Sequence, residues 1–172
     1  MNNNIISSVS RCRLEEQGYR GFTEAELSQH RFGIRMAYVV CMSLVIIGMV
    51  FKSQTFLLIA NGIAFLGMLP PFHPIDYLYN YGFRFLLGRP KLPHRANQGR
   101  FACIMATGML GVMNYYLYLG NLTVVYIVGA SLLGSAFLVS FLDLCIPSKI
   151  YNAFSRIAIG QIKKKISRPG QI

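Results

Sequence analysis

Charged residues are scarce in this sequence, and tryptophan is absent from it. Only 13% of the 172 residues are charged and 53% are hydrophobic, whereas soluble domains carry about 25% charge. Four stretches contain no Asp, Glu, Lys or Arg at all, namely residues 36–51, 55–72, 101–119 and 122–142. So apolar a chain is unlike a disordered protein, and a soluble enzyme of this size would need a more polar surface. The composition therefore predicts one unit embedded in a membrane.

The uncharged stretches predict four transmembrane helices, because about 20 apolar residues cross a bilayer core of roughly 30 Å. The expected spans cover about 34–51, 55–71, 101–119 and 122–142. They are joined in pairs by short turns at 52–54 and 120–121. The alternative, one long buried helix for each pair, would leave a soluble core with too few polar residues to cover it. Thr23 and Glu26 fit a capping box, so the first helix is expected to begin near Glu24.

Acidic residues are few as well, at 6 against 17 Lys and Arg, which gives a net charge of +11. All the basic residues except Lys52 lie before the first span, between the hairpins or after the last span. Because Lys and Arg favour the cytoplasmic side, both termini and the middle segment are expected there. Anionic lipid headgroups, rather than nucleic acid, are the expected partners of this charge. The expected lipid-facing basic rim comprises Arg84, Arg100, Lys149, Arg156, Lys163, Lys164 and Lys165.

Comparison of the sequence with itself indicates an internal duplication. Gln29-His30-Arg31-Phe32 followed by Met36-Ala37 matches Gln98-Gly99-Arg100-Phe101 followed by Met105-Ala106 at the same spacing. After each hairpin, Tyr79-Asn80 matches Tyr151-Asn152. Two spans return the chain to its starting side, so the two copies would be parallel repeats about an axis along the membrane normal.

The duplication predicts how the chain is organised. A cytoplasmic segment 1–28 precedes a first hairpin unit 29–90 and a second unit 91–162, and a basic tail 163–172 follows. Each unit is expected to close with an amphipathic interfacial helix, at 75–87 and 148–162, because polar residues recur there every three or four positions. The expected fold class is an all-α membrane protein of four transmembrane helices in two repeated hairpins.

Cys145 is the candidate for chemistry among four cysteines that include no C-x-x-C pair. Cys41 and Cys103 lie inside spans, where a free cysteine usually serves as a small hydrophobe. Cys145 follows Asp143 at the cytoplasmic end of the fourth span and should lie level with His73 and Asp76. Nearby basic groups can lower the pKa of a cysteine and make it a nucleophile. His73 would then act as base, and Asp143 or Asp76 would orient it.

Two other interpretations of these residues stay open. His73, Asp76 and Cys145 could ligate a metal, but so few scattered ligands are a weak signal, and no metal or cofactor is expected. In the structural interpretation, Asp76 and Asp143 instead form ion pairs with arginines such as Arg84 and Arg100.

The four uncharged stretches also contain no histidine, and only Asn61 and Asn114 are strongly polar there. Transport sites normally contain intramembrane ionisable groups. The first functional hypothesis is therefore a non-enzymatic scaffold or accessory subunit, with another membrane protein or a second copy as partner. The alternatives are a cytoplasmic-face thiol site at Cys145 that assists redox or sulfur handling, and a channel or carrier for small neutral solutes.

Two motifs resemble a known bacterial membrane-protein family. They are the run from His73-Pro74-Ile75-Asp76 to Arg100-Phe101-Ala102-Cys103, and Asp143-Leu144-Cys145-Ile146-Pro147-Ser148. The family is catalogued as domain of unknown function 4395. The resemblance implies a small protein of the bacterial inner membrane, without an agreed activity. Some relatives look as if they have a Cys-x-x-Cys pair where this chain has Cys145 and Ser148, so an intramolecular disulfide is not expected here.

Overall fold

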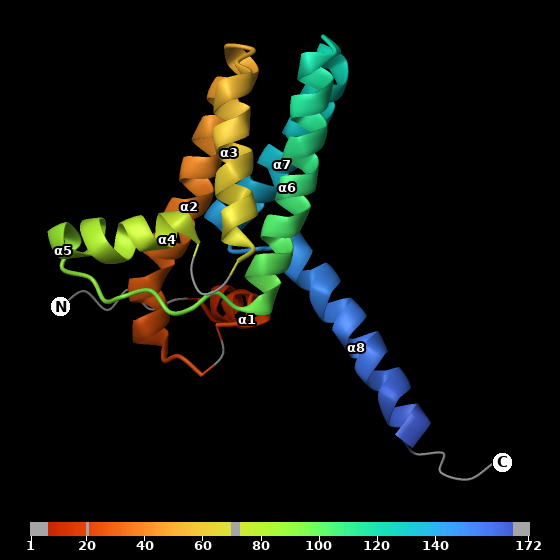
Figure 1. Cartoon of the computed structure of the whole chain (residues 1–172). Helices are drawn as coiled ribbons and strands as arrows, with labels where there is room; N and C mark the ends of the chain where they lie inside the picture. Colours follow the sequence, from red (N-terminus) through yellow and green to blue (C-terminus); the bar gives the residue numbers. More distant parts are fainter. Residues whose placement is uncertain (1–6, 20, 70–72, 167–172) are drawn as a thin grey trace.

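The computed structural model describes the backbone of residues 7–19, 21–69 and 73–166, with side chains except at 87 and 158–166, and its regular elements in these ranges are helices. No strand occurs in these ranges, and the expected all-α class is confirmed. In chain order the elements are α1 (Ser8–Glu16), α2 (Glu24–Val50), α3 (Gln54–Gly67), α4 (Pro74–Leu78), the π-helical turn η1 (Tyr79–Phe83), α5 (Arg84–Leu87), α6 (Asn97–Tyr118), α7 (Leu122–Leu142) and α8 (Ile146–Ile166) (Figure 1).

Four of these helices form a bundle of two hairpins. α2 pairs with α3 and α6 pairs with α7, and the hairpins join through contacts of α3 with α6 and of α2 with α7. Both hairpin turns lie at the same end of the bundle, and α1, α4, α5 and α8 gather around the other end (Figure 1). The bundle therefore has a turn end and an opposite end, where the peripheral helices lie.

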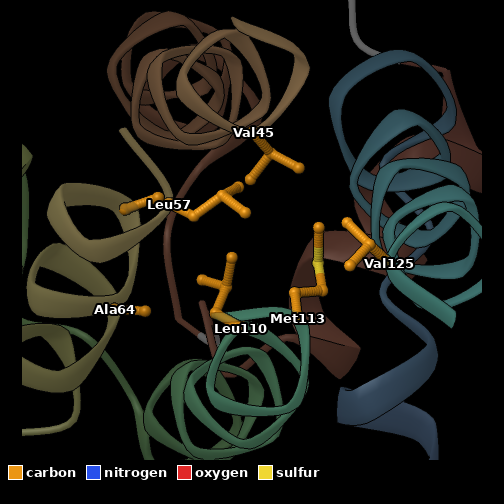
Figure 2. Packing of buried hydrophobic residues seen from close by; sticks show 7 residues of the cluster. Val45, Leu57, Ala64, Leu110, Met113 and Val125 are labelled. Carbon is orange, nitrogen blue, oxygen red and sulfur yellow. The ribbon is translucent and has the colours of Figure 1, made fainter. Parts of the chain in front are cut away.

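The turn half of the bundle is filled by apolar side chains. Leu57, Leu110, Met113 and Val125 point toward one another from α3, α6 and α7 (Figure 2). Gly48 on α2 makes room for this packing, because a Cβ atom there would lie 2.8 Å from Leu57 Cγ. In a bilayer such close contact holds helices together, since lipid tails are as apolar as the side chains.

Three helices, α2, α6 and α7, are long and apolar enough to cross a membrane. The expected third span, 101–119, lies in α6 except for its last residue, Leu119, and the expected fourth span has the same bounds as α7. α3 is apolar but contains 14 residues, or about 21 Å at 1.5 Å per residue, less than a bilayer core of roughly 30 Å. The end of the expected second span, at 70–71, lies outside the described residues.

The predicted beginning of the first helix is confirmed. α2 starts at Glu24, and Thr23 Oγ1 accepts a hydrogen bond from the Glu26 N–H. In return, Glu26 Oε2 accepts one from the Thr23 N–H at 2.8 Å. This reciprocal cap satisfies backbone donors that a helix N-terminus otherwise leaves free.

The segments that follow each hairpin are helical but differ in course. The first, predicted at 75–87, runs from α4 through η1 to α5 and crosses the bundle axis, whereas α8 slants away from the bundle (Figure 1). On the first, Tyr81, Phe85 and Leu86 are exposed. Near the start of α8, the ring of Tyr151 packs in a tilted arrangement against Phe101 of α6. Further along α8, Phe154 and Ile157 are exposed.

Candidate functional site

Asp143 ends α7 and gathers donors from two other helices. Its backbone is left-handed, with φ 53°, and its side chain is 1% exposed. Its carboxylate accepts hydrogen bonds from Arg31 Nη2 at 2.6 Å, Arg35 Nη2 at 2.8 Å and Ser10 Oγ at 3.0 Å. Arg31 and Arg35 are one helical turn apart on α2, so both reach the same carboxylate. The buried charge of Asp143 is thereby fully paired.

α1 completes the end of α7. Arg13 Nη1 donates to the Leu142 carbonyl at 2.6 Å, and Gln17 Nε2 donates to the Asp143 carbonyl at 2.7 Å. The last carbonyls of a helix lack partners within the helix. The segment before the bundle therefore caps α7 and fixes Asp143 in place.

Asp76, in the first turn of α4, forms a second buried ion pair with Arg95. Arg95 Nε donates to Asp76 Oδ2 at 2.8 Å and Arg95 Nη2 donates to Asp76 Oδ1 at 3.2 Å. The two side chains are 7% and 4% exposed. Two parallel bonds of this kind fix both position and orientation. The third guanidinium nitrogen, Nη1, contacts Cys103 Sγ at 3.7 Å.

The carboxylates do form ion pairs with arginines, but the expected partners, Arg84 and Arg100, are wrong. Asp76 faces Arg95 from the segment before α6, whereas Arg84 lies over the Phe85 ring at 4.5 Å. Both Arg84 and Arg100 keep a buried Nε without a hydrogen-bond partner. Asp143 forms its ion pairs with arginines of α2, which belongs to the other hairpin. Residue spacing along one helix could therefore not reveal these ion pairs.

The remaining members of the expected basic rim are only partly described. Lys149 and Arg156 on α8 are exposed. The side chains of Lys163, Lys164 and Lys165 lie outside the described residues. Exposed cations of this kind are available to solvent or to lipid headgroups.

A cavity of about 260 Å³ lies in the half of the bundle away from the hairpin turns. All four bundle helices line it, and three free cysteines, Cys41, Cys103 and Cys145, face it together with His73 and Arg95. His73 and Cys145, which were expected to lie at the same level, both line this cavity. Asp76 and Asp143 are not part of the lining. Cys12, the fourth cysteine, is exposed on α1.

Alanines create this space. Its lining includes six alanines, namely Ala37, Ala60, Ala64, Ala102, Ala106 and Ala136, of which Ala60 and Ala64 also belong to the packed cluster toward the turns. Its volume is slightly below the roughly 300–1,000 Å³ of typical small-molecule sites. A compact ligand, rather than a large cofactor, would fit.

His73 is held rigidly at one end of the cavity. Its Nδ1 accepts the Ile75 N–H at 3.3 Å, which caps α4, and its ring lies against Gly67 of α3. A Cβ atom on Gly67 would stand 2.8 Å from His73 Nε2 and 3.1 Å from Cys103 Sγ. Burial, assisted by the charge of Arg95, lowers the pKa of His73 from its ordinary 6.5. The imidazole is therefore neutral, and with Nδ1 accepting, its proton resides on Nε2.

The expected lowering of the Cys145 pKa is wrong. Burial raises the pKa of this thiol, and this outweighs the opposing effects of Ser148 and Arg95. The thiol is 4% exposed, and burial disfavours its charged form more than the charge of Arg95 favours it. At neutral pH Cys145 is a thiol, the less nucleophilic form.

The expected catalytic relay is not assembled. His73 Nδ1 is occupied by the Ile75 backbone, and the hydrogen bonds of Asp76 and Asp143 go to arginines and to Ser10. Nor does the described part of the chain bring three or more His, Cys, Asp or Glu side chains together as a metal site. What the site offers is a small, mainly apolar space with uncharged thiols and two nitrogen donors at one end.

Several residues of this site were missed by reasoning from the sequence. Cys41 and Cys103 were interpreted as packing residues, although they share the cavity with Cys145. Arg95 was counted only as one of the basic residues between the two hairpins. A usable signal existed for Arg31 and Arg35, whose spacing of four at the end of a span places two cations on one helix face.

These features define an all-helical protein with three helices suited to crossing a membrane and a cavity within its bundle. The family described as Domain of unknown function (DUF4395) matches residues 31–156, and the chain belongs to this family. The match covers α3, α6, α7 and α2 from residue 31 onward, the residues of both buried ion pairs and every lining residue of the cavity. No curated protein and no solved structure matches the chain.

Proposed function

We propose that this protein is a four-span integral membrane protein that acts as a non-enzymatic accessory subunit and binds a small molecule in its bundle. The observation on which this rests is the cavity of about 260 Å³, which is lined by all four bundle helices. The absence of an assembled relay around Cys145 favours binding over catalysis.

The four-span topology follows from the hairpins. α3 starts at the turn end beside α2 and returns to the opposite end, so it crosses the same thickness as α2 within the bundle. The basic residues gather at the opposite end, which we assign to the cytoplasmic side of a bacterial inner membrane, with both termini there. The α4–α5 segment, with exposed Tyr81, Phe85 and Leu86, would lie in the interface among anionic lipids.

The structure is consistent with duplicated units 29–90 and 91–162. His73 and Cys145 stand 72 positions apart, and each is the residue before the helix that follows its hairpin, α4 or α8. Asn80 and Asn152 have the same offset and both tie these helices to other segments. Asn80 Oδ1 accepts the Leu92 N–H, and Asn152 Oδ1 accepts from Gln98. The thiol and the imidazole would then occupy equivalent positions about the repeat axis.

Binding is favoured over conduction of a neutral solute. A pathway through the bundle would have to pass the turn half, where Leu57, Leu110 and Met113 are buried against one another (Figure 2). The cavity is closed by this cluster and reaches only part of the way across. It therefore suits a molecule that stays in place, as in a binding subunit.

The test is to identify small molecules that co-purify from native membranes. Ala136→Leu places a larger side chain in the cavity, while Ala130→Leu makes the same change at an exposed position of α7. We expect a compound with the wild type and the Ala130→Leu variant, and at least about tenfold less with Ala136→Leu, since filling a site removes most of its contacts. Equal amounts in all three preparations would contradict binding in the cavity and leave a purely structural scaffold.

A second candidate is thiol-dependent assistance to redox or sulfur handling, which is favoured because three free thiols share the cavity. Thiol labelling of inside-out vesicles across a pH series tests it. Reaction of Cys145 below about pH 8 would support this candidate, because it would require a thiolate at that pH. A cysteine that reacts only above that pH would remove it.

A further inference from the structure

The polar end of the cavity carries no unpaired charge among its described side chains. Arg95 is neutralised by Asp76, His73 is neutral, and the three cysteines are thiols. The rest of the lining is alanine, methionine, leucine and valine, with two serines on α7. An ion would have to enter this space without a counter-charge, at a cost of several kcal/mol. The cavity therefore selects an uncharged ligand.

Strong hydrogen-bond donors, not strong acceptors, face the cavity at this end. His73 is 3% exposed and, with Nδ1 occupied, presents Nε2–H. Arg95 uses Nε and Nη2 on Asp76, which leaves Nη1 with only the weak contact to Cys103 Sγ at 3.7 Å. Thiols are weak donors as well. A ligand that binds to these donors must offer a hydrogen-bond acceptor. A carbonyl oxygen is an acceptor that carries no charge.

Three residues that line the cavity are also exposed at the surface, namely Met105 on α6, Ser131 on α7 and Ile146 at the start of α8. Met105 and Ser131 lie within the third and fourth spans, at membrane depth. These two positions offer a route into the cavity from the hydrocarbon region between α6 and α7.

We propose that the cavity binds an uncharged, lipophilic carbonyl compound, which enters from the bilayer between α6 and α7. Its carbonyl oxygen accepts hydrogen bonds from His73 Nε2 and Arg95 Nη1, and its hydrocarbon part lies along the alanine lining toward Met105 and Ser131. This inference rests on the proposed binding function and adds the ligand class and its route.

The test uses the full-length protein in phospholipid nanodiscs and two probes, tridecan-2-one and tridecane, which differ by one carbonyl group. Alkylation of Cys145 by N-ethylmaleimide is followed by mass spectrometry, with exposed Cys12 as the internal reference. We expect tridecan-2-one to slow alkylation of Cys145 relative to Cys12 about tenfold more than tridecane does, the size expected of two hydrogen bonds.

Variants give the test a second arm. Ala136→Leu should abolish the protection and Ala130→Leu should keep it, while Ser131→Phe on the route into the cavity should slow its onset. His73→Leu removes one of the two hydrogen bonds and should reduce the excess protection by the ketone from about tenfold to about threefold, and the thermal unfolding midpoint of each variant reports whether the fold is retained.

The outcomes separate this inference from the proposed function. Equal protection by ketone and hydrocarbon would overturn the carbonyl class and leave binding in the cavity intact. Protection by neither probe would overturn both. If the ketone protects Cys145 equally well in the wild type and in the Ala136→Leu variant, the ligand lies outside the cavity. This result would overturn the inference.

Discussion

Replacing Asp76 with Asn should destabilise the protein more than the same replacement at Asp143. Either change removes one negative charge and keeps the shape of the side chain. Asp76→Asn leaves Arg95, which is 7% exposed, without a counter-charge. Removing one partner of a buried ion pair costs about 3–5 kcal/mol, so a loss of this size is expected.

The Asp143→Asn replacement leaves two arginines without their carboxylate, but both are partly accessible to solvent. Arg31 and Arg35 are 31% and 28% exposed, so water or lipid phosphate can replace part of the lost interaction. Solvent screening reduces the expected loss to about 1–3 kcal/mol. The backbone adds no strain, because Asn tolerates the left-handed conformation that Asp143 adopts at φ 53°.

The assay is reversible unfolding of the purified protein in mixed micelles, with the free energy of unfolding measured for both variants and the wild type. A matched control, Asp76→Leu with Arg95→Leu, removes both charges and should recover most of the loss, because an apolar pair leaves no buried ion. The prediction would be wrong if Asp76→Asn and Asp143→Asn lowered the free energy of unfolding equally, or if the double variant did not regain it. Either result would show that burial of the arginine does not determine the loss of stability.

Three further predictions concern the cavity. Gly67→Ala should lower the free energy of unfolding by about 1–3 kcal/mol, because the added Cβ meets His73, whereas Gly62→Ala on the same helix has open space and should be neutral or stabilising. Because the pKa of His73 is lowered in the folded state, the unfolded chain binds the extra proton. Stability should then fall below its ordinary pKa of 6.5 by up to about 1.4 kcal/mol per pH unit, and His73→Leu should remove that slope in unfolding measured across pH. Alkylation of Cys145 should reach half its maximal rate only above pH 9.0, the ordinary pKa of a cysteine.

Elements along the chain could be predicted from the sequence because their signals are local. The absence of charge from 122–142 gave the bounds of α7, and the pair Thr23 and Glu26 gave the start of α2. The second span was expected to be short, at 55–71, but the end of α3 at Gly67 was not predicted, because Met68 and Leu69 are as apolar as the helix that they follow. An uncharged apolar stretch shows how many residues could lie in a membrane, but it does not show at which residue the helix ends.

The site was less accessible to such reasoning. Which arginine meets Asp143 depends on how the hairpins pack, and Arg31 lies 112 residues away along the chain. The cavity depends on what is missing from a helix face, since an alanine at 106 or 136 looks in the sequence like any other small residue. His73 and Cys145 were found because they flank proline-marked helix starts, which is again a local signal.

The ion pairs also set an order for the biosynthesis of this protein. Arg31 and Arg35 leave the ribosome more than a hundred residues before Asp143, their only carboxylate partner in the described chain. Until then the two arginines lack this carboxylate, and their positive charges repel each other one helical turn apart. Completion of the second hairpin supplies Asp143, so neutralisation of these charges coincides with closure of the bundle. A chain truncated before Asp143 would keep both charges unneutralised by this carboxylate, and its α2 would lack the ion pairs that tie it to the end of α7.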